Sequence, residues 1–256
     1  MKFGLLFSQQ VPPASGLSWR EPYDDMLSCL PRAEDLGYES CFQVSHHAQK
    51  DGLCPGPLIA CAGAAAVTKH MRVGTGVLLV PMYAPLKLAE DVAVLDNLSG
   101  GRFIFGVAPG YVAREFEAHG VPREERVGRF EEALDLMTRA WTEETFSFDG
   151  RYYKVPETQL TPKPAQSPHP PIWYGVSAKS SLRRAAKRHA VQIMSPRHGP
   201  EELIDHFKPY EEAAAAEGWT IPERPIIRSV FIAESHAKAE EIAAPALNYL
   251  FTELYG

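Results

Sequence analysis

Apolar residues along this chain recur with two alternating spacings. Short apolar runs of strand length are each followed by a longer segment in which apolar residues return every three or four positions, as on one face of a helix. In the N-terminal half, the predicted strands are Phe3–Phe7, Tyr38–Val44, Met71–Val80 and Arg102–Ala108, and the predicted helices are Pro22–Leu36, Gly56–Thr68, Pro85–Leu98 and Arg126–Trp141. Apolar strands joined through helices are typical of parallel βαβ units, so the pattern predicts a parallel α/β sheet.

This alternation is interrupted between residues 145 and 171. Thr145–Val155 contains two short alternating runs around Asp149–Gly150, a dipeptide typical of a hairpin turn, and a proline-rich connector follows up to Pro171. We therefore interpret 145–171 as an insertion. Beyond it, the predicted strands are Pro171–Val176, Ala190–Met194 and Ile226–Ala233, and the predicted helices are Ala178–Arg188, Pro200–Glu217 and His236–Tyr255.

Seven strands, each followed by a helix, are one unit short of a TIM (β/α)8 barrel. A doubly wound open sheet can hold the same number of parallel strands. The barrel is favoured because the loops with candidate chemistry follow four different strands, and a barrel gathers the carboxyl ends of its strands at one mouth. We predict a single α/β domain of the TIM-barrel type over 1–256, with the eighth unit absent from this sequence or the barrel closed in another way.

The composition is that of a globular protein without the basic charge of a nucleic-acid-binding protein. Hydrophobic residues make up 45% and charged residues 23% of the 256 positions, and the formal net charge is −6. No apolar stretch reaches the roughly 18 residues of a membrane helix, and the apolar start of the chain is too short for a secretory signal. No CxxC spacing occurs, so we expect free thiols in the cytoplasm at Cys29, Cys41, Cys54 and Cys61.

Candidate chemistry lies near the carboxyl ends of the predicted strands. His46 and His47 follow the second strand, where an imidazole can exchange a proton near neutral pH; a pair with solvent contacts only is the alternative. Gly76 lies inside the third strand, where a glycine marks either the close approach of a ligand or simple packing. The glycine loop that ends at Gly110 and Tyr111 exposes N–H groups that can hold an anion.

Two further segments suggest binding surfaces. Ser177 lies where the fifth strand gives way to the fifth helix, and a hydroxyl beside helix N–H groups is a natural phosphate ligand; a plain N-cap is the alternative. The alanine-rich helix Gly56–Thr68 has small side chains on nearly every side. Small side chains let another element approach closely, so this helix is expected to be buried or to form a subunit interface.

Four ordered blocks of the sequence resemble the bacterial luciferase-like monooxygenase family. They are AEDLGYESCFQVSHH (Ala33–His47), GTGVLLVPMYAPLKLAEDVAVLDNLSGGRFIFGVAPGY (Gly74–Tyr111), EFEAHGVPREERVGRFEEALDLMTRAW (Glu115–Trp141) and PKPAQSPHPPIWYGVSAKS (Pro162–Ser180). Together they run over essentially the whole chain. The resemblance implies a barrel that binds reduced flavin mononucleotide (FMN), or in some branches a deazaflavin, at its mouth.

The same resemblance implies roles for particular residues. His46 corresponds to a histidine implicated as a catalytic acid–base. Gly76 and Val77 correspond to a site where family members carry a non-proline cis peptide behind the flavin ring. The positions around the flavin phosphate correspond to Gly110, Tyr111, Ser177 and Ala178.

These features favour a flavin-dependent monooxygenase that oxidises a small organic substrate with reduced FMN and O2. No second nucleotide-binding fingerprint is visible, so we expect a separate flavin reductase, and the small-faced helix and the resemblance predict a homodimer. A deazaflavin-dependent hydride transferase and a shortened flavin-binding protein without turnover stay open. A metal hydrolase using His46, His47 and His198 is a further alternative, but no HxH pair or zinc-helix motif supports it.

Overall fold

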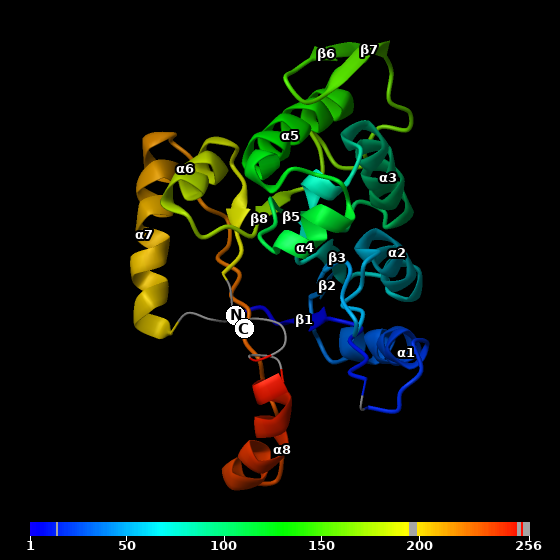
Figure 1. Cartoon of the computed structure of the whole chain (residues 1–256), viewed down its shortest axis with the longest axis vertical. Coiled ribbons are helices and arrows are strands. Elements are labelled where there is room, and N and C mark those ends of the chain that lie inside the picture. The colour runs from blue at the N-terminus through cyan, green and yellow to red at the C-terminus, as the bar shows by residue number, and fades with distance from the viewer. Residues whose placement is uncertain (14, 195–198, 250–251, 253–256) are drawn as a thin grey trace.

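The computed structural model describes residues 1–13, 15–194, 199–249 and 252. A parallel sheet lies at its centre (Figure 1) and consists of β1 (Gly4–Phe7), β2 (Ser40–Gln43), β3 (Arg72–Thr75), β4 (Leu78–Leu79), β5 (Phe103–Ala108), β8 (Ile172–Tyr174) and β9 (Val191–Gln192). The hydrogen-bonded order is β1-β2-β3-β5-β8-β9, with β4 also paired to β5. Neighbours in the sheet therefore follow the order of the chain.

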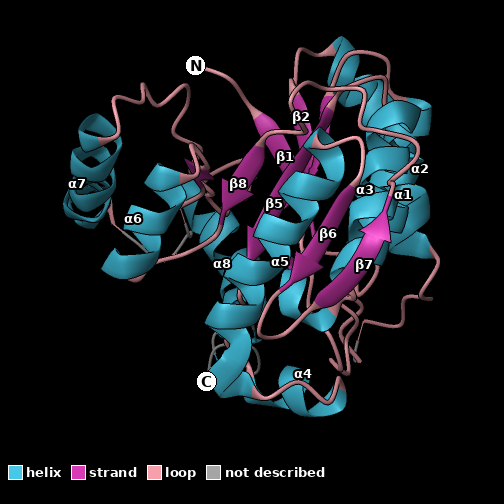
Figure 2. Ribbon diagram, turned by 90° about the horizontal axis from the view of Figure 1, so that it is seen from above, coloured by secondary structure: helices cyan, strands magenta, loops and turns pink. Residues whose placement is uncertain are grey.

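The helices surround this sheet. They are α1 (Glu21–Asp35), α2 (Pro57–Val67), α3 (Pro85–Leu98), α4 (Ala113–Ala118), α5 (Arg126–Thr142), α6 (Lys179–Lys187), α7 (Pro200–Ala216) and α8 (His236–Tyr249). Figures 1 and 2 show α1, α2, α3, α5 and α6 in an arc around the strands. Because the strand order never reverses, right-handed crossovers place successive helices on the same face. This is the winding of a barrel, as predicted, and not that of a doubly wound sheet.

Apolar clusters cover both faces of the sheet. Strand β5 is buried along its whole length, and its alternate residues point to opposite faces. Phe103 and Phe105 belong to the large cluster between the sheet and the outer helices, where Phe105 contacts Trp141 of α5. Ile104 belongs to the smaller inner cluster, whose other buried members are Trp173, Val191 and Ile193. A strand without polar positions is expected where both faces are covered.

The third predicted strand is divided into two pieces. Met71–Val80 contains β3 and β4, and between them the peptide bond that joins Gly76 to Val77 is cis. A cis peptide at this place was implied by the family resemblance. Its position behind a flavin ring stays a prediction.

The strand predicted at Ile226–Ala233 is wrong. Only Ile226 pairs with the sheet, through a parallel bridge to Met194, and the N–H of Ile227 donates to the Met194 carbonyl at 3.1 Å. Val230 and Ile232 are 77% and 87% exposed. An apolar run becomes a strand only where a neighbouring edge satisfies its backbone hydrogen bonds, and within the described ranges that pairing ends after Ile227.

Two helices also differ from the prediction. Helix α4 (Ala113–Ala118) was not predicted, because six residues are too few to show a clear helical period. The last predicted helix, His236–Tyr255, is observed as α8 up to Tyr249. Residues 250, 251 and 253–256 lie outside the described residues.

The insertion contains the predicted hairpin. Strands β6 (Phe146–Asp149) and β7 (Lys154–Thr158) pair antiparallel. The Glu132 carboxylate of α5 accepts the backbone N–H groups of Arg151, Tyr152 and Tyr153 at 3.0, 2.8 and 2.8 Å. Three N–H groups without strand partners thus donate to one carboxylate, and these hydrogen bonds attach the hairpin turn to the outer helix layer.

The thiols agree with the sequence-based expectation. All four cysteines are free; three are buried and Cys29 is exposed. Across the described part of the chain, every helix is too short or too polar to cross a membrane.

Candidate active site

The carboxyl ends of β2, β3, β5 and β8 lie side by side along one edge of the sheet. Gln43 of β2 pairs with Thr75 of β3, and the next N–H, that of Gly76, donates to the Gln43 carbonyl at 2.7 Å. Likewise the N–H of Gly175, just after β8, donates to the carbonyl of Val107 in β5 at 2.9 Å. Along this edge, in strand order, follow His46, Gly76–Val77, Gly110–Tyr111 and Ser177–Ala178. The structure therefore gathers the predicted site residues in one row.

His46, at one end of the row, is paired with a buried carboxylate. Its Nδ1 lies 2.9 Å from Oε1 of Glu115 in α4, and the same oxygen accepts the backbone N–H of His47 at 2.9 Å. Glu115 is fully buried, whereas the His46 side chain is 18% exposed. Burial alone would raise the pKa of Glu115, but the hydrogen bonds from His46 and His47 outweigh it and lower the pKa below its usual value. The pair can therefore hold a proton on His46 beside a negative charge.

His47 faces away from solvent. Its Nε2 lies 3.3 Å from the hydroxyl of Ser45, and its ring meets the rings of His119 and Tyr83 edge-on, with centroids 4.7 and 6.1 Å away. Burial, reinforced by the neighbouring His119, lowers the pKa of His47. The interpretation of His46 and His47 as a pair with solvent contacts only is therefore wrong, because His47 is a buried, neutral residue at pH 7 and His46 is largely enclosed.

Gly76 and Val77 lie between His46 and the β8 end of the row. A Cβ on Gly76 would lie 3.1 Å from Leu6 and 3.2 Å from Phe42, so glycine permits close packing on the inner face here. The Val77 side chain lies against Gly175, where a Cβ would come within 2.9 Å of it. These contacts join the β3–β4 junction to the end of β8. Binding of a cofactor ring by Gly76 and Val77 stays a prediction.

Gly110 and Tyr111 follow β5 directly. Gly110 has a φ of +78°, which favours glycine, and a Cβ there would lie 3.1 Å from the ring of Phe116. Tyr111 is 49% exposed and presents its ring edge-on to His46, with centroids 6.4 Å apart. The structure thus brings His46 and Tyr111 together, although they are separated by more than sixty residues of sequence.

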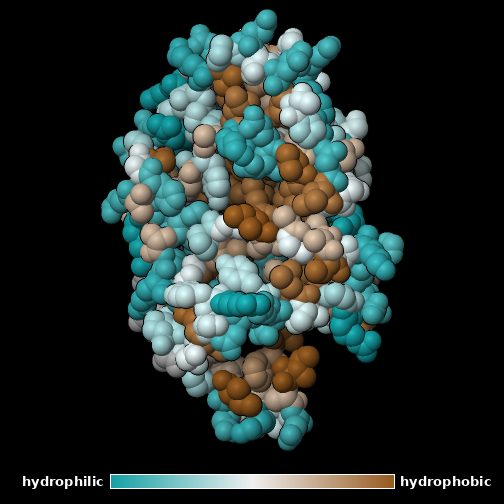
Figure 3. Space-filling model, turned by 90° about the vertical axis from the view of Figure 1, so that its right-hand side faces the viewer, coloured by the Kyte–Doolittle hydropathy of each residue, from teal (hydrophilic) through white to brown (hydrophobic). Residues whose placement is uncertain are grey.

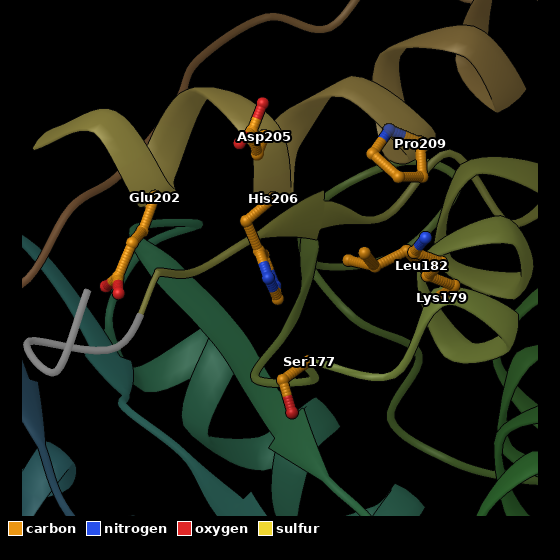
Figure 4. Close-up of a pocket in the computed structure, with 7 residues that line it drawn as sticks. All are labelled: Ser177, Lys179, Leu182, Glu202, Asp205, His206 and Pro209. Atoms are coloured by element: carbon orange, nitrogen blue, oxygen red, sulfur yellow. The ribbon is translucent and has the colours of Figure 1, made fainter. Parts of the chain in front are cut away.

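Ser177 and Ala178 lie at the other end of the row, before α6. Ala178 is the N-cap of α6 and makes no side-chain capping bond, so the interpretation of Ser177 as a plain N-cap is wrong. Ser177 is exposed and lines an open cavity of about 350 Å³ between this loop and α7 (Figure 4). In Figure 4 the ring of His206 extends from α7 toward this loop. An uncapped helix start beside a hydroxyl can accept an anion.

Comparison with known proteins assigns the fold to a family. The family model for luciferase-like monooxygenases matches residues 1–253. The chain belongs to the luciferase-like monooxygenase family. This family member is 30% identical over 241 residues to the oxygenase component of the flavin-dependent trigonelline monooxygenase of Acinetobacter baylyi, with 91% of this chain and 65% of the relative covered. The chain thus spans just under two thirds of that relative's length.

Solved structures of luciferase-like monooxygenases show the same TIM-barrel-type fold. A monooxygenase from Streptomyces bottropensis superposes with a TM-score of 0.89 at 30% identity, covering 97% of this chain and 77% of that one. The oxygenating constituent of 3,6-diketocamphane monooxygenase from Pseudomonas putida, solved in complex with FMN, superposes with a TM-score of 0.84 at 26% identity, covering 100% of this chain and 74% of that one.

The sequence did not single out Glu115 as a site residue. The available signal is its place: an acidic residue that follows the glycine loop by a few positions, at the beginning of a short helix. The metal alternative is not supported by a ligand cluster, because the described residues contain no group of three or more metal-ligating side chains. His198, which that alternative needs, lies outside the described residues.

Proposed function

We propose that this family member is a flavin-dependent monooxygenase that uses reduced FMN and O2 to oxidise a small organic substrate. The observation that carries the proposal is the single row of strand ends, which holds a histidine–carboxylate pair at one end and an uncapped helix start at the other. The flavin-dependent monooxygenase from Acinetobacter baylyi and the FMN complex from Pseudomonas putida support the same cofactor class.

The residues along the row fit an FMN molecule at both ends. The start of α6 offers N–H groups that no side chain caps, with the Ser177 hydroxyl and Ala178 beside them, which suits a phosphate. Toward the middle of the row, Gly76 packs closely on Leu6 and Phe42, and this packed backbone offers a wall for a flat ring. We assign Gly76 and Val77 to the ring, Ser177 and Ala178 to the phosphate, and Gly110 and Tyr111 to the part of the cofactor that lies between these two ends.

The mechanism assigns separate tasks to the two ends of the row. Reduced FMN, when bound, supplies the electrons that activate O2. His46, whose ring meets that of Tyr111 edge-on, holds or releases a proton, and the buried Glu115 carries the balancing charge.

Anaerobic titration with reduced FMN, followed by addition of O2, tests the proposed function. We expect one FMN to bind per chain, and oxygen to be consumed in step with oxidation of an added substrate. Long-chain aldehydes, terpenes and sulfonates provide a first substrate panel. Binding of a reduced deazaflavin with substrate reduction and without oxygen consumption would replace the proposal with the hydride-transferase alternative. Flavin binding without any turnover would favour a non-catalytic flavin carrier.

We further propose that a separate reductase supplies the reduced flavin in the cytoplasm. The Acinetobacter relative is named as the oxygenase component of its system, which supports a division of labour between two proteins. The four free thiols suit a reducing compartment.

Helix α2 supports the proposal of a homodimer. Its sequence, PLIACAGAAAV, contains no charged residue, although Ile59 is 81% exposed and Val67 37% exposed. Figure 3 faces the side formed by α1, α2 and α3 and shows hydrophobic surface gathered over its middle. A helix that is apolar on every side is usually covered, and a second copy of this chain would cover the exposed side.

Ile59→Asp is therefore expected to convert dimers into monomers, because it places a charge in the proposed contact. Sedimentation velocity measures the change. Ile204→Asp on α7 is the matched control, since Ile204 is 72% exposed on a different helix. Equal sedimentation of the Ile59→Asp variant and the unmodified protein would exclude α2 from an interface.

A further inference from the structure

We infer that Glu115 is a positioning residue for His46, which fixes the imidazole with its proton on Nδ1 and leaves Nε2 as the atom that accepts and returns a proton. The catalytic meaning of this arrangement rests on the proposed function.

Backbone hydrogen bonds hold both the Glu115 carboxylate and the His46 residue in place. Oε1 of Glu115 lies 2.9 Å both from Nδ1 of His46 and from the backbone N of His47. The N–H of His46 in turn donates to the carbonyl of Leu53 at 3.0 Å. Because backbone groups hold both partners, rotation of the His46 ring would break the contact with Oε1. The ring orientation is therefore fixed from the Nδ1 side.

Charge then decides which nitrogen carries the proton. An ionised carboxylate only accepts hydrogen bonds, and the pKa of Glu115 is lowered despite its burial. Nδ1 must therefore donate, in the neutral as well as in the charged form of His46. Nε2, on the opposite edge of the ring, is the nitrogen whose proton can come and go.

The other groups described around His46 and Glu115 are histidine and tyrosine rings, so Glu115 is the group here that can balance a positive charge on His46. Residue His47 is neutral at pH 7, because burial lowers its pKa. His119, from the end of α4, directs Nδ1 to the Glu115 backbone carbonyl at 2.9 Å, and its ring lies against His47. The rings of Tyr111 and Tyr83 approach His46 and His47 edge-on.

Glu115→Gln removes the negative charge of residue 115 and keeps the size and shape of its side chain. The amide oxygen can replace Oε1 and keep both hydrogen bonds, while the amide nitrogen takes the place of Oε2, which among the described residues is buried without a hydrogen-bond partner. Glu115→Ala removes the acceptor as well. Glu117→Gln is the matched control, because Glu117 is an exposed carboxylate on the same helix.

Nitrogen-15 NMR of the flavin-free protein tests the inference without any turnover. The His46 signals are assigned by comparison with His46→Asn. We expect the Nδ1–H form in the unmodified protein and in Glu117→Gln, retention of that form in Glu115→Gln, and a mixture of both tautomers in Glu115→Ala.

Each outcome decides the inference. An Nδ1–H form in Glu115→Ala, or an Nε2–H form in the unmodified protein, would overturn it. If Glu115→Ala does not fold, loss of the Nδ1–H form in Glu115→Gln overturns the inference and retention of that form supports it. The NMR results are independent of oxygen consumption, so tautomer control without turnover would refute the proposed function alone, and normal turnover with unchanged NMR signals would refute the positioning role alone.

Discussion

His46→Ala is expected to lower oxygen-dependent turnover about 10² to 10⁴-fold while leaving the affinity for reduced FMN nearly unchanged. The loss is large because the variant removes the proton-carrying group and leaves Glu115 buried without its charge partner. FMN affinity is preserved because the proposed phosphate contacts lie three strands away, at Ser177 and Ala178. Stopped-flow absorbance with reduced FMN, combined with an oxygen electrode, measures both quantities.

His70→Ala is the control for this experiment, because His70 is an exposed histidine outside the row of strand ends. Its turnover should equal that of the unmodified protein. Unchanged turnover in His46→Ala would remove His46 from the mechanism. A parallel loss of FMN affinity and turnover would instead assign His46 to cofactor binding.

Gly106→Ala is expected to destabilise the fold by about 3 kcal/mol or more, at or above the upper end of the usual cost of overpacking a core. A Cβ on Gly106 would lie 1.8 Å from the carbonyl oxygen of Thr75 and 2.9 Å from its carbonyl carbon. Both atoms are backbone and cannot rotate away. The Thr75 hydroxyl also donates to the Gly106 carbonyl at 2.6 Å, so separating the two strands would break this hydrogen bond as well.

Urea unfolding followed by circular dichroism measures this effect. Gly63→Ala in α2 is the matched control: the added Cβ would meet only the Leu27 side-chain end, at 3.2 Å, and alanine favours helix more than glycine by about 1 kcal/mol. The control should therefore unfold at the same or a higher urea concentration. A Gly106→Ala variant that unfolds with the control would show that β3 and β5 can separate without cost.

Periodicity predicted the elements that bury one face over many residues. Helix α3 (Pro85–Leu98) begins and ends where predicted, because apolar spacing, an N-terminal proline and glycines after the helix agree. Ile226–Ala233 has the same apolar character as a strand, but strand formation needs a pairing edge, which a local pattern does not encode. Gly76 inside Met71–Val80 was a local signal for an irregular strand, whereas the cis peptide between Gly76 and Val77 was implied by the family resemblance alone.

The candidate site was predicted in outline and not in its contacts. His46, Gly110 and Ser177 each follow a predicted strand. They were therefore expected at the same edge of the sheet, because the carboxyl ends of parallel strands lie at one edge. Glu115 was missed because its contact with His46 crosses 69 positions of sequence and is made by a short helix. The N-cap of α6 is Ala178 and not Ser177, a difference of one residue that backbone dihedrals decide.

Consecutive pairing of β1, β2, β3 and β5 has a consequence for biosynthesis. Each new strand finds its docking edge already made by the segment synthesised just before it, so the sheet can grow in step with the ribosome. The segments that carry His46 and Glu115 are complete by the end of α4 at Ala118, before half of the 256 residues have emerged. The His46–Glu115 pair can therefore assemble on the nascent chain before β8 and α6 have emerged.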